Sequence, residues 1–109
     1  MRTTRCSMDD KQVKFVRSKV SLEERLCQLA EEAAELAQAA LKLRRAYGDA
    51  NPTTLSCADA YMCLREEVAD VALCLYVFGI EDIYEASEDQ MTNKLNRWCE
   101  RLKERKNET

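Results

Sequence analysis

Two groups of acidic residues are the part of this sequence best suited to chemistry. They occupy positions 31–35 (Glu-Glu-Ala-Ala-Glu) and 66–70 (Glu-Glu-Val-Ala-Asp). The second and fifth residues of each group are three positions apart, and residues three apart lie side by side on the surface of a helix. If both segments are helical, each presents a pair of neighbouring carboxylates. The four side chains concerned are Glu32, Glu35, Glu67 and Asp70.

Glu67 is the acid that is hardest to interpret as a surface residue. At about 100° per residue, it falls inside the apolar stripe of its helix, and Asp70 falls at the border of that stripe. On the earlier helix, Glu32 lies near the edge of the stripe and Glu35 lies further out. An ionised carboxylate on an apolar face costs free energy unless a cation or a hydrogen-bond donor meets it. The stripe around Glu67 consists of Cys57, Ala60, Tyr61, Leu64, Val68, Val71, Cys74, Leu75 and Phe78.

These carboxylates predict a site for a hard divalent cation. If the two helices pack antiparallel, four negative charges converge, and a divalent cation would neutralise their repulsion. All the ligand atoms are oxygens and the chain contains no histidine, which selects Mg²⁺ or Mn²⁺. Inward-facing carboxylates on paired bundle helices can build such a site. Acidic residues at helical spacing more often form a solvated face, and we interpret Glu31 and Glu66 in that way.

Long helices must position these acids, because the chain has only two glycines and one proline, too few turn residues for a β-rich fold. We expect a short leading helix over residues 9–19. The first long helix begins with the capping box Ser21–Glu24 and runs to about Tyr47, where Gly48 stops it. Its apolar residues are Leu22, Leu26, Leu29, Ala33, Leu36, Ala37 and Ala40.

Two further long helices complete the predicted bundle. The second begins near Thr54 or Ser56 and ends before Gly79. The third covers about residues 83–105, and residues 106–109 should fray. The fold class is therefore all-α, a helical bundle of three long helices plus a short leading helix. The last helix carries on one face Met91, Leu95, Trp98 and Leu102.

Composition and charge exclude several classes of protein. A net charge of −3 is too small to indicate a nucleic-acid partner, which usually requires a strongly basic surface. No apolar run could span a bilayer and the start has no apolar segment of a signal peptide, so we expect a cytoplasmic protein. The six cysteines are then reduced thiols. The length predicts a single domain over residues 1–109.

The two acidic groups resemble the MazG-like, all-α NTP pyrophosphohydrolase superfamily. The resemblance lies in the segments 29–36 and 66–71 and extends over about residues 21–105. That superfamily also contains dimeric dUTPases, dCTP pyrophosphatases and phosphoribosyl-ATP pyrophosphohydrolases. The resemblance implies an enzyme that hydrolyses a nucleoside triphosphate to NMP or dNMP and pyrophosphate, by cleaving the bond between the α- and β-phosphates.

The resemblance also implies roles for individual residues. Glu32 would orient or deprotonate the attacking water. Lys94 and Arg97 would contact the substrate phosphates, whereas Arg101 is better interpreted as part of a solvated basic stripe. The family further implies a bundle that assembles as a homodimer or homotetramer. The implied Mg²⁺ ligands are Glu32, Glu35, Glu67 and Asp70.

Two other functions fit the same helices. One is a non-catalytic helical oligomerisation or adaptor module, and the other is a nucleotide-binding member of the family without turnover. An adaptor has no reason to place Glu67 in its apolar stripe. All four implied ligand positions are acidic, which argues against a degenerate enzyme.

Overall fold

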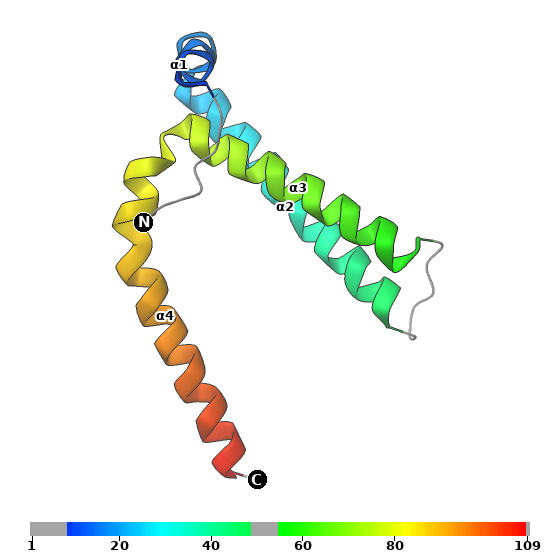
Figure 1. Cartoon of the computed structure of the whole chain (residues 1–109). Coiled ribbons are helices and arrows are strands. Elements are labelled where there is room, and N and C mark those ends of the chain that lie inside the picture. Colours follow the sequence, from blue (N-terminus) through cyan, green and yellow to red (C-terminus); the bar gives the residue numbers. More distant parts are fainter. Residues whose placement is uncertain (1–8, 49–54, 109) are drawn as a thin grey trace. The chain divides into compact units, whose positions relative to one another are not determined.

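The computed structural model describes residues 9–48 and 55–108, apart from the side chains of residues 80–86 and 106–108. The described residues contain no β-strand, and this confirms the predicted all-α class. None of the described helices is both long enough and apolar enough to cross a membrane. The helices are α1 (Asp10–Lys19), α2 (Leu22–Tyr47), α3 (Cys57–Phe78) and α4 (Ile80–Glu108) (Figure 1).

Residue contacts divide the chain into two compact units, Met1–Phe78 and Gly79–Thr109. The first unit contains α1, α2 and α3, and the second contains α4. All four predicted acidic ligands belong to the first unit, whereas Lys94 and Arg97 belong to the second. The geometry of the acids is therefore a property of the first unit alone.

The capping box predicted at the start of α2 is present. The amide of Glu24 donates to Ser21 Oγ over 3.1 Å, and the amide of Ser21 donates to Glu24 Oε1 over 3.2 Å. These two bonds satisfy amides that have no partner inside the helix. At the other end, the amide of Gly48 donates to the carbonyls of Arg44 and Arg45. The helix ends at Gly48 as predicted, with extended rather than left-handed backbone there (φ −94°).

The start of α3 is set by Ser56, one of the two predicted positions; the other, Thr54, lies outside the described residues. Ser56 Oγ accepts from the amide of Asp59 over 3.1 Å, the bond that a serine N-cap makes. The helix ends before Gly79, whose positive φ of 104° is readily adopted only by glycine. Both predicted ends of α3 thus agree with the structure.

The predicted bounds of the last helix are too narrow. Helix α4 starts at Ile80 rather than near Ile83, because Gly79 alone makes the turn and the next residue is already helical. It also continues to Glu108, so residues 106–108, which were expected to fray, are helical. No glycine or proline follows Gly79 to stop the helix earlier. Thr109 lies outside the described residues.

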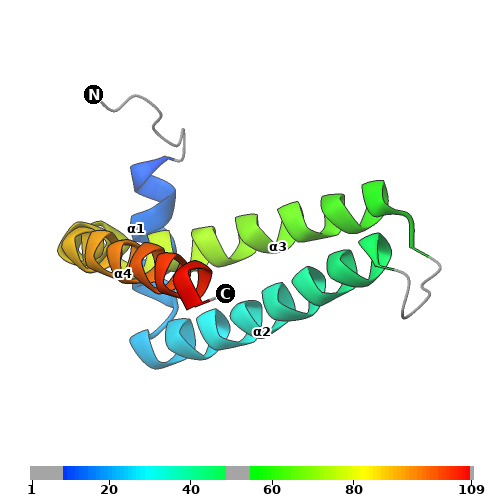
Figure 2. The same cartoon turned by 90° about the horizontal axis from the view of Figure 1, so that it is seen from below.

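Helices α2 and α3 lie side by side and antiparallel (Figures 1 and 2). At one end of this hairpin, Cys57 Sγ donates to the carbonyl of Ala46 over 3.2 Å. Two alanines, Ala39 of α2 and Ala60 of α3, are buried. Such small side chains let helices approach closely. The face of α2 that is at least half-buried along the hairpin consists of Leu29, Glu32, Leu36, Ala39 and Leu43.

The predicted apolar stripe of α2 is therefore only partly correct. Leu29 and Leu36 lie on the packed face, but the other predicted members are exposed. A single neighbouring helix covers only a narrow strip of α2, and an alanine-rich helix gives little indication of which strip that is. On α3 the predicted stripe is mostly packed, and its exposed residues are Tyr61 and Val68. The exposed residues of the predicted α2 stripe are Leu22, Leu26, Ala33, Ala37 and Ala40.

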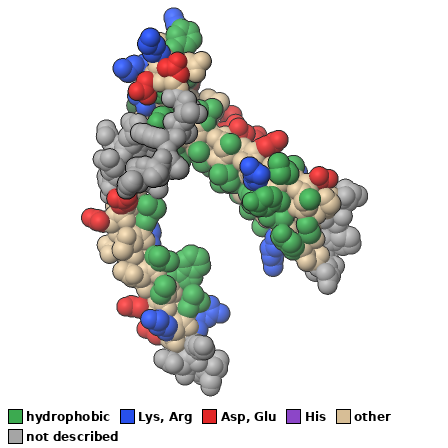
Figure 3. All heavy atoms as spheres, in the orientation of Figure 1, with side chains coloured by type: hydrophobic (Ala, Val, Ile, Leu, Met, Phe, Trp, Pro, Cys, Tyr) green, Lys and Arg blue, Asp and Glu red, His purple; other side chains and the backbone are tan. Residues whose placement is uncertain are grey.

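Much apolar surface remains uncovered in both units. The space-filling view shows hydrophobic side chains along the hairpin and along α4 (Figure 3). All four residues of the predicted apolar face of α4 belong to this uncovered surface, since their side chains are between 45% and 59% exposed. Exposed apolar surface of this extent is typical of an interaction surface. The four residues are Met91, Leu95, Trp98 and Leu102.

The carboxyl end of α3 is held by two arginines from other helices. Arg17 of α1 donates from Nε to the carbonyl of Val77 over 2.6 Å and from Nη2 to that of Tyr76 over 2.9 Å. Arg25 of α2 donates to the carbonyls of Val20 and Val77. Helix α3 has no basic residue in its own last turn. The arginines thus supply the donors and the positive charge that a helix carboxyl end requires.

Replacing Arg17 by alanine should lower the free energy of unfolding by about 2 kcal/mol, because two carbonyls lose a charged donor. Chemical denaturation of the full-length chain, followed by circular dichroism, measures this change. Lys14→Ala removes an exposed cation from the same helix and should stay within about 0.5 kcal/mol of wild type. Equal stability of the two variants would mean that these hydrogen bonds contribute nothing.

Candidate metal centre

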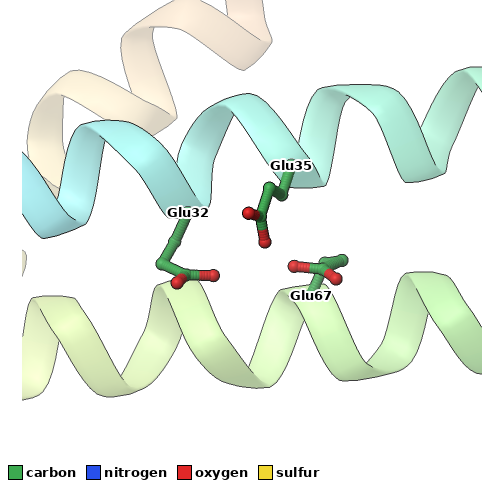
Figure 4. Close-up of side chains that lie close together, drawn as sticks. All are labelled: Glu32, Glu35 and Glu67. Atoms are coloured by element: carbon green, nitrogen blue, oxygen red, sulfur yellow. The ribbon is translucent and has the colours of Figure 1, made fainter.

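Three of the four predicted acids come together between α2 and α3. Glu32, Glu35 and Glu67 each offer a carboxylate oxygen, and these oxygens all lie within 4.8 Å of one another. Figure 4 shows the two side chains of α2 and the one of α3 pointing toward one another. The antiparallel pairing places both acidic groups at the same level of the hairpin. Residues as many as 35 positions apart in sequence thus build one cluster through tertiary packing.

The inward acids of the cluster are only partly hydrated. Glu32 and Glu67 are half-buried, whereas Glu35 is exposed. The Oε1 atoms of Glu32 and Glu67 are inaccessible to solvent, and neither has a hydrogen-bond partner among the described residues. A buried carboxylate oxygen without a donor is costly. These two oxygens are therefore placed where a cation would satisfy them.

Burial is the main cause of the raised pKa of the Glu32 carboxyl group. The negative charges of Glu35, Asp70 and Glu67 raise this pKa further, in that order. Both effects disfavour the ionised form, the first by loss of hydration and the second by repulsion. A proton or a metal cation bound here would relieve both.

The pKa of Glu67 is raised in the same way. Burial contributes most, followed by the charges of Glu35 and Asp70 and by a hydrogen bond with the Glu35 carboxyl group. Loss of hydration and repulsion thus disfavour the ionised form of Glu67, as they do that of Glu32.

Asp70 lies beside the cluster rather than in it. Its side chain is exposed and is not one of the three acids whose oxygens converge. Its charge nevertheless raises the pKa of Glu32, of Glu67 and of the Cys74 thiol. Asp70 is therefore near enough to act on the centre electrostatically, which suits its predicted position at the border of the apolar stripe.

The remaining predicted residues lie on exposed surfaces. Glu31 and Glu66, interpreted above as solvated, are both exposed. Lys94 and Arg97 are exposed on α4, in the second unit. Every cysteine within the described ranges is a free thiol; Cys6 lies outside those ranges. The free thiols are those of Cys27, Cys57, Cys63, Cys74 and Cys99.

Sequence reasoning missed three residues that shape the surroundings of the centre. Arg17 and Arg25 fix the end of α3, and the missing basic residue in the last turn of α3 is the signal that could have indicated them. Cys74 was assigned only to the apolar stripe. Its position one helical turn after Asp70 was the signal that it adjoins the acids.

Comparisons with models of protein families, with curated proteins and with solved structures gave no match for this chain. The chemistry of the centre therefore follows from its own residues. Three convergent carboxylates, two with a buried oxygen that lacks a donor, offer only hard oxygen ligands. Such ligands suit Mg²⁺ and Mn²⁺ better than softer metals.

The raised pKa values of Glu32 and Glu67 predict that the metal-free chain loses stability as the pH rises. Each group binds its proton more tightly in the folded chain than at its ordinary pKa of 4.5. The resulting stabilisation is fully present below pH 4.5 and is lost as the pH rises through the raised pKa. In EDTA at neutral pH, Glu67→Gln should therefore unfold at a higher temperature than wild type, with a smaller difference below pH 4.5.

Thermal unfolding of both proteins across this pH range tests the expectation. Glu100→Gln, which removes an exposed acid of α4, is the control and should follow the wild-type profile. If the unfolding temperature of Glu67→Gln also followed the wild-type profile at every pH, folding would not disfavour the Glu67 carboxylate.

Proposed function

We propose that this chain is a Mg²⁺-dependent nucleoside triphosphate pyrophosphohydrolase that forms NMP or dNMP and pyrophosphate. The observation that carries the proposal is the convergence of three carboxylates between α2 and α3. Its support from sequence is the resemblance of the two acidic groups to the MazG-like superfamily. The three clustered side chains are all acidic, so they suit a cation. A cation bound there could in turn bind a polyphosphate.

Glu32, Glu35 and Glu67 would hold the metal, and Asp70 would complete the ligand set from the border of the cluster. The solvent-inaccessible oxygens of Glu32 and Glu67 fit this role because they have no hydrogen-bond partner among the described residues. Mn²⁺ fits the same oxygens. Bound there, the ion would neutralise phosphate charge and make a bound water more acidic.

Glu32 is the residue that we assign to proton transfer. Its carboxylate would accept a proton from the attacking water, while the water oxygen forms a bond to phosphorus and the bridge between the α- and β-phosphates breaks. The leaving oxygen departs with the electron pair of the broken bond. Partial burial of Glu32 restricts its side chain and favours the protonated form that it would reach after this step.

Lys94 and Arg97 would contact the phosphates. They are three positions apart on α4 and exposed, so both can lie on one side of that helix. Polyphosphate recognition needs cationic donors, and arginine offers two parallel N–H groups to one phosphate. The acids alone would repel a polyanion, so a substrate with several phosphates needs cationic donors of this kind in addition to the metal ion.

A homodimer or homotetramer is the assembly that we infer. Among its described residues, the first unit buries four hydrophobic side chains, two of which are Val13 of α1 and Val77 of α3. Small cores of this kind are often completed by association. The exposed stripe of α4, from Met91 to Leu102, supplies apolar surface for such an assembly.

The competing function is a non-catalytic adaptor. The same exposed apolar surfaces favour it, since they would suit partner helices as well as a second copy. An adaptor gains nothing from Glu67, whose buried oxygen has no partner within the described residues. A nucleotide-binding protein without turnover would retain the acids, and only an activity measurement separates it from the enzyme.

A pyrophosphate-release assay over ribo- and deoxyribonucleoside triphosphates should show turnover with Mg²⁺ and none with EDTA. Glu67→Gln and Asp70→Asn should abolish release while the helical circular dichroism signal is kept. Glu32→Gln should lower kcat by roughly 10²–10⁴-fold, the usual contribution of a general base. Glu66→Gln, an exposed neighbour, should retain most of the activity.

Absence of release from every triphosphate, with folded protein and metal present, would refute the enzyme. Full turnover by Glu67→Gln would refute the ligand assignment instead. Nucleotide binding without pyrophosphate release would favour the alternative of a nucleotide-binding protein without turnover.

Removal of one phosphate contact should weaken substrate use without loss of the fold. We expect Lys94→Ala and Arg97→Ala each to lower kcat/KM about tenfold to a hundredfold, because each removes a charge-assisted hydrogen bond. Steady-state kinetics at saturating Mg²⁺ measures the change. Lys103→Ala removes an exposed cation of the same helix as the control, and equal kinetics of all three variants would exclude these phosphate contacts.

A further inference from the structure

A small pocket lies in the first unit between α1, the start of α2 and the end of α3. Its volume is about 160 Å³, smaller than the roughly 300–1,000 Å³ of pockets that enclose a whole drug-sized ligand. It is therefore suited to one group of a larger molecule. The residues that line it are Val16, Val20, Arg25, Gln28, Leu73, Cys74 and Val77.

This pocket adjoins the acidic cluster. On α2, Gln28 precedes Glu32 by four residues, and on α3, Cys74 follows Asp70 by four. Four residues are about one helical turn, or roughly 5–6 Å along the axis. The pKa of Cys74 is raised by burial and then by the charges of Glu32 and Asp70, so these acids act on a wall of the pocket. A molecule bound at the acids can thus extend one turn along the hairpin into the pocket.

The lining combines apolar walls with one available amide. Valine and leucine side chains from α1 and α3 form the walls. The Arg25 guanidinium is fixed in orientation, because its Nε and Nη1 atoms donate to the carbonyls of Val20 and Val77. The exposed Gln28 side chain brings two donors and one acceptor to the rim. An apolar slot with one amide suits a flat heteroaromatic ring that has both donors and acceptors on its edge.

We propose that this pocket receives the base of the nucleotide and that Gln28 is a specificity-determining residue that reads the edge of that base. The inference rests on the proposed function, because the phosphates would occupy the acidic cluster. The sugar then spans the single helical turn between cluster and pocket. Leu73 and Val77 provide the apolar surface against which the ring lies.

Base preference tests the role of Gln28. With Mg²⁺ present, the kcat/KM ratio between the best and the poorest base should shrink by about tenfold or more in Gln28→Ala, since loss of one hydrogen bond changes binding by that order. Gln38→Ala removes an exposed glutamine from the same helix, away from the pocket lining. This control should keep the wild-type ratio. An unchanged ratio in Gln28→Ala would overturn the assignment.

A second measurement needs neither metal nor turnover. Ribonucleosides in EDTA should slow the alkylation of Cys74 by iodoacetamide, as read by mass spectrometry of peptides, whereas ribose alone should not. Cys63 is an exposed thiol on the same helix and serves as the internal control. Equal rates at Cys74 with and without any nucleoside would overturn the proposed base pocket.

The two experiments separate the inference from the function on which it rests. If wild type releases no pyrophosphate from any triphosphate, the proposed function fails, whatever happens at Cys74. If wild type is active but Gln28→Ala and Gln38→Ala share its base preference, and no nucleoside protects Cys74, the function stands and the base pocket is wrong.

Discussion

The repulsion between carboxylates enclosed by α2 and α3 is the constraint on which the rest of the first unit depends. Glu32 and Glu67 sit within the packed faces of the two helices, and burial raises the pKa of both. Without a cation, packing elsewhere along the hairpin must offset this cost. The buried alanines Ala39 and Ala60 contribute by letting the helices approach closely, which extends their dispersion contacts.

The hairpin is fixed on either side of the acids, and this explains how it can hold them together. Beyond one side, the Cys57 thiol donates to the carbonyl of Ala46. Beyond the other, Arg17 and Arg25 bind the last carbonyls of α3. Hydrogen bonds at both ends resist the separation of the helices that repulsion in the middle would favour. The short helix α1 therefore serves the centre although none of the clustered acids belongs to it.

Local signals made most of the first unit predictable from sequence. The Ser21 capping box, Gly48 and Gly79 each set a helix end through contacts within a few residues. The position of Glu67 inside an apolar stripe also indicated an inward carboxylate, because that stripe is formed by nearby residues of the same helix. The packed strip of α2 was harder, because it depends on which neighbour covers an alanine-rich helix. The hydrogen bonds of Arg17 join residues about sixty positions apart, and no local pattern contains that information.

The unequal burial of the acids indicates that these residues serve a function rather than the stability of the fold. In a purely structural hairpin, an apolar side chain of similar size in place of Glu67 would pack without a desolvation cost, and buried charges are often replaced in that way without loss of stability. Glu35 and Asp70 face water, which hydrates their charge and leaves negative charge beside the inward acids. A cation drawn there must displace any proton held by the inward acids, so its affinity rises with pH. Stability alone does not require this arrangement, whereas the reversible metal centre proposed above would use it.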